Sequence, residues 1–344
     1  MSSLKEEIDE NAIINEYKHL RITEDSEMVM PIPIVSIGNS PIITESNICV
    51  ISGQPKEGKS SFVYYILSQA ILPEFGIFNN DIWEGIDIAR NTNNKAIIHI
   101  DTEQAQHNHV NAYKNSIWKR SGMGTPPDYF QSYNLRGLSV SECKLVLKKL
   151  LLACNKKFNG IYLIVIDGVT DLLKSVNDEE ESNAVVRVLE NIARVFKCAI
   201  IVVIHTNPGS AKQRGHLGSQ LQRKAESVVL VKKEENVSYV EPQFLRNASN
   251  TDVPIVQFTF DKEMGYHVSA GIKEKKSLTQ DKEDNHKDTA GKVFTDKAIS
   301  NKDAISSIVN ITGKSQRTAQ NYLSKMVELK FVCKTEEGYI LKVE

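Results

Sequence analysis

One short segment combines glycines, a lysine and a serine at a spacing that suits phosphate binding. Residues 51–61, ISGQPKEGKSS, fit the pattern GxxxxGKS from Gly53 to Ser60. Glycines let the backbone curl so that its N–H groups face a polyphosphate, and a following helix N-terminus adds positive potential. We therefore predict that Lys59 neutralises the β- and γ-phosphates of a nucleotide and that Ser60 holds Mg²⁺; the alternative is a chance glycine turn. The predicted binding residues are Gly53, Gln54, Pro55, Lys56, Glu57, Gly58, Lys59, Ser60 and Ser61.

Polar residues follow the next apolar run. Residues 95–104, KAIIHIDTEQ, place Asp101, Thr102 and Glu103 after a buried strand. The carboxyl ends of strands in open parallel sheets face the ligand crevice. A carboxylate there can accept a proton from the water that attacks the γ-phosphate. We predict this general-base role for Glu103 and supporting roles for Asp101 and Thr102; the alternative for Glu103 is a solvated strand-end charge or a helix cap.

Two later apolar runs end in Asp167 and His205. A carboxylate at the Asp167 position can hold Mg²⁺ beside Ser60. His205 stands at the same strand-end level, where it could contact the γ-phosphate and report its loss to the loop that follows. The alternative for His205 is a structural histidine with satisfied hydrogen bonds. The pair His107 and His109 is predicted to lie on a helix surface and to bind no metal.

A glycine-rich basic loop and a later arginine are candidates for contacts outside the phosphate site. The loop, NPGSAKQRGHLGSQLQRK, contains Arg214 and Arg223 and is predicted to line a DNA channel or a subunit interface. The alternative is a solvated surface loop. Arg246 ends a likely strand, YVEPQFLR, and is a candidate arginine finger for a neighbouring subunit's nucleotide.

The elements that must position these residues alternate between strands and helices. The expected strands are apolar runs at 47–52, 95–100, 161–166, 199–204 and 226–231. Continuous apolar strands separated by helical patterns predict an α/β fold with a parallel sheet covered on both faces. The expected division is an extended, partly flexible segment at 1–45, an ATPase core at 46–268, a polar linker at 269–292 and a small unit at 293–344.

The last unit is predicted to be a winged helix that binds DNA. Ser300 and Ser315 can cap two helices, and Glu337-Gly338 can turn a hairpin. Residues 291–344 hold nine Lys or Arg and six Asp or Glu, a locally basic balance. The residues predicted to contact DNA from the exposed side of the second helix are Lys314, Gln316, Arg317 and Gln320. The alternative is a unit that binds another protein.

Composition narrows the class of protein. The 344 residues include 42 Lys and Arg against 43 Asp and Glu, so nucleic-acid binding would have to be local. No run of about 18 apolar residues predicts a membrane span. The five cysteines are far apart and form no CxxC pair, so we expect neither a disulfide framework nor a zinc module and predict a cytoplasmic protein.

The order of these parts resembles a RecA-like ATPase core of the DnaB-like and RepA-like helicase branch. The matching segments are GQPKEGKSS, IIHIDTE, IYLIVIDG, VVIHTNPG and RGHLGSQLQRKAESVVLV, within residues 30–265. The resemblance implies ATP hydrolysis at the subunit interfaces of a homo-oligomeric ring, commonly a hexamer, with single-stranded DNA in the channel. Two features depart from the pattern. Arg246 lacks the lysine found two residues earlier in the branch, and only about 45 residues precede the core, so no separate N-terminal helical domain is expected.

The leading prediction is an Mg²⁺-dependent ATPase that acts on DNA as a RepA-like replicative helicase of a plasmid or mobile element. The first alternative is a DNA-binding regulator or loader in which ATP switches assembly without unwinding. A small-molecule kinase that uses the same phosphate loop is the second alternative. The loop after His205 and the C-terminal unit argue against the kinase, because neither would serve a small substrate.

Overall fold

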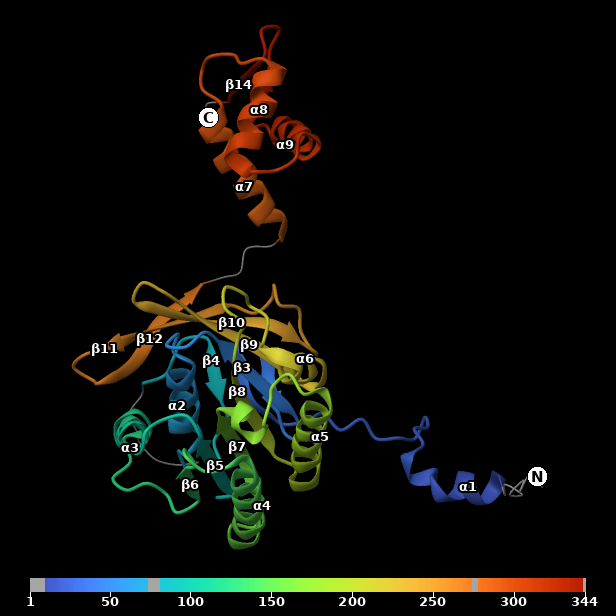
Figure 1. The fold of residues 1–344 in the computed structure, drawn as a ribbon, viewed down its shortest axis with the longest axis vertical. Coiled ribbons are helices and arrows are strands. Elements are labelled where there is room, and N and C mark those ends of the chain that lie inside the picture. Colours follow the sequence, from blue (N-terminus) through green and yellow to red (C-terminus); the bar gives the residue numbers. More distant parts are fainter. Residues whose placement is uncertain (1–9, 74–80, 274–277, 343–344) are drawn as a thin grey trace. The chain divides into compact units, whose positions relative to one another are not determined.

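A large mixed sheet organises the chain in the computed structural model, which describes residues 10–73, 81–273 and 278–342 (Figure 1). Its strand order is β12-β11-β10-β9-β3-β8-β7-β5-β6. The strands from β9 to β6 in this order run parallel, and β10, β11 and β12 add an antiparallel extension beside β9. The bounds are β3 Ile48–Gly53, β5 Ala96–Asp101, β6 Phe130–Asn134, β7 Ile161–Asp167, β8 Ala199–His205, β9 Ser227–Glu234, β10 Val237–Leu245, β11 Ile255–Asp261 and β12 Tyr266–Lys273.

The predicted α/β class is confirmed, and each of the five apolar runs forms a strand: β3, β5, β7, β8 and β9. These strands read as continuous apolar runs because both faces of the sheet are covered. Neighbouring residues face opposite sides, so Ile97 packs into one apolar core and Ile98 into the other. The antiparallel extension makes the sheet mixed, where the apolar runs alone predicted a parallel sheet.

Helices cover each face of the sheet. The first core receives side chains from α2 (Lys59–Ala70) and from the π-helix η2 (Ala112–Lys119), which continues α3 (Gln106–Asn111). The second core receives α4 (Val140–Lys157), α5 (Glu179–Phe196), α6 (Gly215–Lys224) and η3 (Val169–Leu172). The glycine-basic loop was predicted to lack regular structure, but its second half is α6. Leu217 and Leu221, one helical turn apart, are fully buried and anchor that helix.

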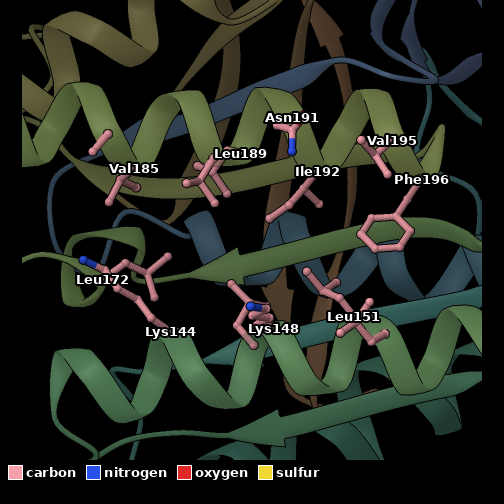
Figure 2. A pocket seen from close by; sticks show the side chains of 14 residues that line it. Lys144, Lys148, Leu151, Leu172, Val185, Leu189, Asn191, Ile192, Val195 and Phe196 are labelled. Atoms are coloured by element: carbon pink, nitrogen blue, oxygen red, sulfur yellow. The ribbon is translucent and has the colours of Figure 1, made fainter.

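An apolar groove of about 500 Å³ lies between α4 and α5 (Figure 2). Leu151 of α4 and Leu189 of α5 lie at its base, with Lys148 on its rim. Val188 of α5 is apolar, yet its side chain is 56% exposed and lines the groove. Helix α4 therefore does not cover the whole apolar face of α5.

The N-terminal boundary of the folded part falls earlier than predicted. Three short strands, β1 (Pro33–Ile37), β2 (Ser40–Thr44) and β4 (Ile86–Ile88), form a separate antiparallel sheet. Ile37 and Ile43 are fully buried and pack into the same core as α2. Residues 33–44 therefore belong to the core rather than to a flexible segment. The preceding unit, up to Ile32, contains α1 (Glu10–Glu16) and the 3₁₀ helix η1 (Lys18–Leu20), and its described residues are exposed.

The C-terminal residues form three helices and a hairpin around a separate core (Figure 1). The elements are α7 (Leu278–Val293), α8 (Asn301–Thr312), α9 (Gln316–Glu328), β13 (Val332–Lys334) and β14 (Tyr339–Leu341). Ser300 and Ser315 accept hydrogen bonds from backbone N–H groups at the starts of α8 and α9, so both predicted caps are confirmed. Ile299 also pairs with Tyr339 beside the hairpin.

The segment predicted as a polar linker, 269–292, is mostly regular structure. Its first residues complete β12, and α7 occupies 278–292 and ends at Val293. His286 and Ala290, one helical turn apart, are buried, and the His286 ring packs edge-on against Tyr322 at a centroid distance of 4.3 Å. A narrow buried stripe is enough to hold a helix whose other described positions are mostly charged or polar.

Two further findings concern membrane-spanning helices and the cysteines. Among the helices described, none combines the length and apolar character needed to cross a membrane. All five cysteines are free thiols, and four of them are buried: Cys49, Cys143, Cys154 and Cys198.

Candidate functional site

The sheet brings the predicted strand-end residues to one edge. In the parallel register, Gly53 pairs with His205 and Asp101 pairs with Asp167. The residues that follow β3, β5, β7 and β8 therefore open onto the same pocket, which has a volume of about 400 Å³. The pocket is lined by Pro55, Lys56, Gly58, Lys59, Ser60, Ser61, Glu103, Asp167, His205, Lys233, Ser238 and His267.

The loop between β3 and α2 needs glycine at two positions. Gly58 has φ +103°, and a Cβ there would lie 2.9 Å from Ser238 Oγ and 3.0 Å from the Phe258 ring. A Cβ on Gly53 would lie 2.3 Å from the carbonyl oxygen of Val231. Both glycines thus let the loop pass close to strands β9, β10 and β11, on the side of the pocket that Lys233, Ser238 and His267 line.

Lys59, the first residue of α2, is buried in this loop. Its Nζ donates to the carbonyl oxygens of Gly53, at 3.1 Å, and Gln54, at 2.6 Å. Burial lowers the pKa of Lys59, while the carboxylates of Asp167, Glu103 and Glu57 act in the opposite direction. The ammonium group thus lies within the loop, where it could stabilise a bound anion.

Ser60 and Asp167 are in direct contact. Ser60 Oγ donates to Asp167 Oδ2 at 2.7 Å. Burial raises the pKa of Asp167 to about 7, and the nearby Asp101 and Glu103 carboxylates add to this, while Ser60 and Lys59 oppose it. A hydroxyl and a carboxylate are hard oxygen donors, and the excess of carboxylates around them would be relieved by a divalent cation. This donor set fits Mg²⁺.

Glu103 faces His205 across the pocket. Glu103 Oε2 lies 3.5 Å from His205 Nε2, and this imidazole lowers the pKa of Glu103, as does Lys59, against the effect of burial. Gly168, which follows Asp167, has φ +98°, and a Cβ there would lie 2.2 Å from Thr102 Oγ1 and 2.8 Å from Glu103 Cγ. Sequence reasoning gave Gly168 no role, but it leaves the space in which Glu103 sits.

The phosphate-loop segment is also tied to the loop that follows β8. The Gln54 side-chain amide donates to Thr206 Oγ1 and to the Asn207 carbonyl oxygen, both at 2.6 Å. The backbone N–H of Gln54 donates to the carboxylate of Glu57. One N–H group of this loop is therefore directed at a carboxylate oxygen.

The other side of the pocket was missed by sequence reasoning. Lys233 at the end of β9, Ser238 on β10 and His267 on β12 line it. Burial lowers the pKa of His267 to about 4, and the positive charges of Lys233 and Arg120 add to the shift. Lys233 carried a weaker signal than Asp167 and His205, because it is the second residue after its apolar run rather than the first. Ser238 and His267 carried none, because their strands reach the pocket through antiparallel pairing that the local sequence does not indicate.

Arg246 is not part of the assembled pocket. It follows β10, whose Leu245 pairs with Ser227 at the start of β9, so it lies at the opposite edge of the sheet from Lys59. Its guanidinium donates to the carbonyl oxygens of Lys224, at 3.3 Å, and of Ala225, at 3.4 Å. Within one subunit, Arg246 therefore does not reach the pocket.

The predicted DNA-contacting residues are exposed, in two separate regions. Arg214 precedes α6, and its backbone N–H donates to the His205 carbonyl oxygen at 3.0 Å. Arg223, in the last turn of α6, donates to the side chain of Gln220. The side chains of Lys314, Gln316, Arg317 and Gln320 are exposed at the start of α9 and on its outer face.

The prediction for His109 was wrong. His107 is exposed on α3, but His109 is 6% exposed. The His109 ring reaches Asp101, with 3.6 Å between Nδ1 and Oδ2, and Ser132, with 2.7 Å between Nε2 and Oγ. The spacing argument correctly excluded convergence of the two histidines, but it could not reveal that one of them faces the sheet.

Comparison of the sequence with protein-family models gives no match, and comparison with curated proteins gives none either.

Proposed function

We propose that this chain is an Mg²⁺-dependent ATPase with a RecA-like core, and that it acts on DNA as a replicative helicase of the RepA-like kind. The observation that supports it best is the convergence of five polar side chains, from the ends of four parallel strands, in one pocket. Lys59, Ser60, Glu103, Asp167 and His205 together supply a cation, two metal ligands, a base and a hydrogen-bonding ring.

Each residue has a chemical task in this proposal. Lys59 binds the β- and γ-phosphates together with backbone N–H groups of residues 53–61. Glu103 accepts a proton from the attacking water, and its lowered pKa keeps it ionised and ready to do so. His205 holds the Glu103 carboxylate and faces the γ-phosphate, from where the following loop could respond to hydrolysis.

Ser60 and Asp167 would hold Mg²⁺. The bound ion would neutralise negative charge on the phosphate oxygens. Ser60 and Asp167 would then each give up their mutual hydrogen bond for a metal contact.

The proposal includes a homo-oligomer, with a hexameric ring as the expected form. The distance of Arg246 from the pocket of its own subunit favours a role across an interface. An arginine finger of this kind contributes roughly 10³- to 10⁵-fold in rate in related phosphoryl transfers. Mixing R246A with K59A should therefore restore activity that neither variant has alone, and inactive mixtures despite co-assembly would remove Arg246 from this role.

DNA is the proposed partner at two places. The helices α8 and α9 and the following hairpin are compatible with a winged helix, and the exposed residues of α9 would contact duplex DNA. Arg214 and Arg223 would contact single-stranded DNA in the ring channel. A chain ending at Lys273 should keep ATPase activity and lose duplex affinity at fixed salt; unchanged affinity would instead favour a protein-binding role for the C-terminal unit.

The deciding experiment measures ATP hydrolysis with and without single-stranded DNA, together with strand separation of a forked duplex. A helicase gives DNA-stimulated hydrolysis and ATP-dependent unwinding. Hydrolysis and DNA binding without unwinding would replace this proposal with an ATP-switched regulator or loader. Absence of hydrolysis in the folded protein would contradict the ATPase assignment itself.

A further inference from the structure

A buried carboxylate lies directly behind Glu103. Asp101 is the last residue of β5 and is fully buried. Its Oδ1 accepts the backbone N–H groups of Glu103, at 3.0 Å, and Gln104, at 2.8 Å. This arrangement fixes the turn by which the chain leaves the strand, and therefore the direction in which the Glu103 side chain points.

The second oxygen of Asp101 is also engaged. Asp101 Oδ2 accepts the side-chain amide of Gln104 at 2.8 Å and lies 3.6 Å from His109 Nδ1. The same Gln104 amide donates to the hydroxyl of Tyr64 on α2. The carboxylate that sets the turn is thus linked to α2 through Gln104, and the His109 ring of α3 packs beside it.

An outer set of polar side chains fixes the orientation of the His109 ring. Asn134 on β6 donates to the Gln104 carbonyl oxygen at 2.9 Å, and its Nδ2 lies 3.3 Å from His109 Nδ1. Ser132 Oγ lies 2.7 Å from His109 Nε2 and 2.9 Å from His99 Nδ1.

One proton arrangement satisfies these contacts. The 3.6 Å separation from Asp101 is too long for a hydrogen bond, so His109 Nδ1 accepts from Asn134. His109 Nε2–H then donates to Ser132, whose hydroxyl donates to His99 Nδ1. Both imidazoles are neutral in this arrangement, in keeping with the effect of burial, which lowers the pKa of each.

We propose that Asp101 is the positioning residue for Glu103, and that the His109 ring, held by Ser132 and Asn134, confines the Asp101 carboxylate by packing beside it rather than by a hydrogen bond. The inference rests on the proposed ATPase function, in which Glu103 is the base. In this proposal, groups on β5, β6 and α3 determine the orientation of the Glu103 side chain. Asp101 acts through the backbone of residues 103 and 104 and touches no reacting atom.

The test compares D101A with D101N in the full-length protein. Asparagine keeps an oxygen that can accept both N–H groups, whereas alanine removes it. D101A should lower single-turnover kcat by roughly 10- to 100-fold, the scale of a misplaced catalytic group, with ATP affinity changed by less than about 2-fold. D101N should stay within about 3-fold of the wild type in both quantities, since the Asx-type turn survives.

A second background separates positioning from a general structural defect. If Asp101 acts through Glu103, the two substitutions should not have additive effects. Adding D101A to the E103Q variant should then lower kcat by less than about 2-fold beyond the effect of E103Q alone. A further 10-fold loss in that background would overturn the inference. H109A gives a milder test if D101A fails to fold: it should lower kcat by about 3- to 10-fold alone and by nothing beyond E103Q.

Amide hydrogen exchange gives a readout that does not depend on hydrolysis. The N–H groups of Glu103 and Gln104 should exchange at least about 10-fold faster in D101A and at the wild-type rate in D101N. Equal protection in all three proteins would overturn the inference. A wild-type protein without ATPase activity would contradict the proposed function, whereas an active wild type with a fully active D101A would contradict only the positioning role.

Discussion

The two sides of the pocket differ in how their polar groups are held. On the parallel side, Ser60 bonds to Asp167, and Glu103 pairs with His205, all at or just after strand ends or at a helix start. On the antiparallel side, Lys233 is exposed near the end of its strand, and its positive charge acts on the neighbouring His267. Side chains that hold one another in a fixed orientation are suited to catalysis, whereas an exposed cation is suited to binding an anionic ligand. We therefore expect substitutions on the parallel side to lower turnover and substitutions on the antiparallel side to weaken ATP binding.

The largest effect is expected on the parallel side. E103Q keeps the shape of the side chain but cannot accept a proton. It should bind ATP normally and lower kcat by at least ~100-fold, in line with the loss of a general base. Steady-state hydrolysis and nucleotide titration would measure both quantities; normal turnover would return Glu103 to a structural role.

A smaller effect, on ATP binding rather than on turnover, is expected for Lys233. K233A should raise KM for ATP by about 3- to 10-fold and leave kcat nearly unchanged, because it removes one partly exposed charge contact. The adjacent Lys232 provides a matched control, since its Nζ pairs with Glu241 at 2.9 Å and it does not line the pocket. Equal effects of K232A and K233A would mean that only overall charge matters and would remove the distinction between the two sides.

The smallest effect is expected for Glu57. Its carboxylate accepts the Gln54 N–H and would compete with a phosphate for that donor. E57Q should therefore raise ATP affinity by about 2- to 5-fold, since such a partly exposed charge is worth up to about 1 kcal/mol. Calorimetric titration would measure the change. Weaker binding would mean that Glu57 supports the loop rather than competing for it.

The same contrast explains how far the sequence could predict the site. Asp167 and His205 each follow an apolar run that is buried on both faces, and such runs in a parallel sheet end at a common edge. Local sequence therefore predicted which residues would meet. Ser238 and His267 reach the pocket only because β10 pairs with β9 and because β11 and β12 extend the sheet beyond β10, and the local sequence does not indicate this pairing.

Prediction of the fold from sequence was limited in a similar way. Helices with few apolar positions were misread as loop or linker, because Leu217 and Leu221 in α6, and His286 and Ala290 in α7, are the anchors of otherwise polar segments. The buried state of His109 depends on Asp101 and Ser132, which lie 8 and 23 residues away in the chain. Apolar patterns with a helical or strand period can be recognised in the sequence, whereas polar contacts between elements depend on the tertiary fold.

The most direct test of the central claim is ATP hydrolysis by the wild type and by K59A, assayed side by side with Mg²⁺. Lys59 is buried at the loop, with its ammonium group bonded to loop carbonyls rather than packed in an apolar core. We predict hydrolysis by the wild type, background turnover by K59A, and thermal unfolding curves that show both proteins folded. Equal turnover by the two proteins, or no hydrolysis by the folded wild type, would contradict the assignment of this pocket as an ATPase site.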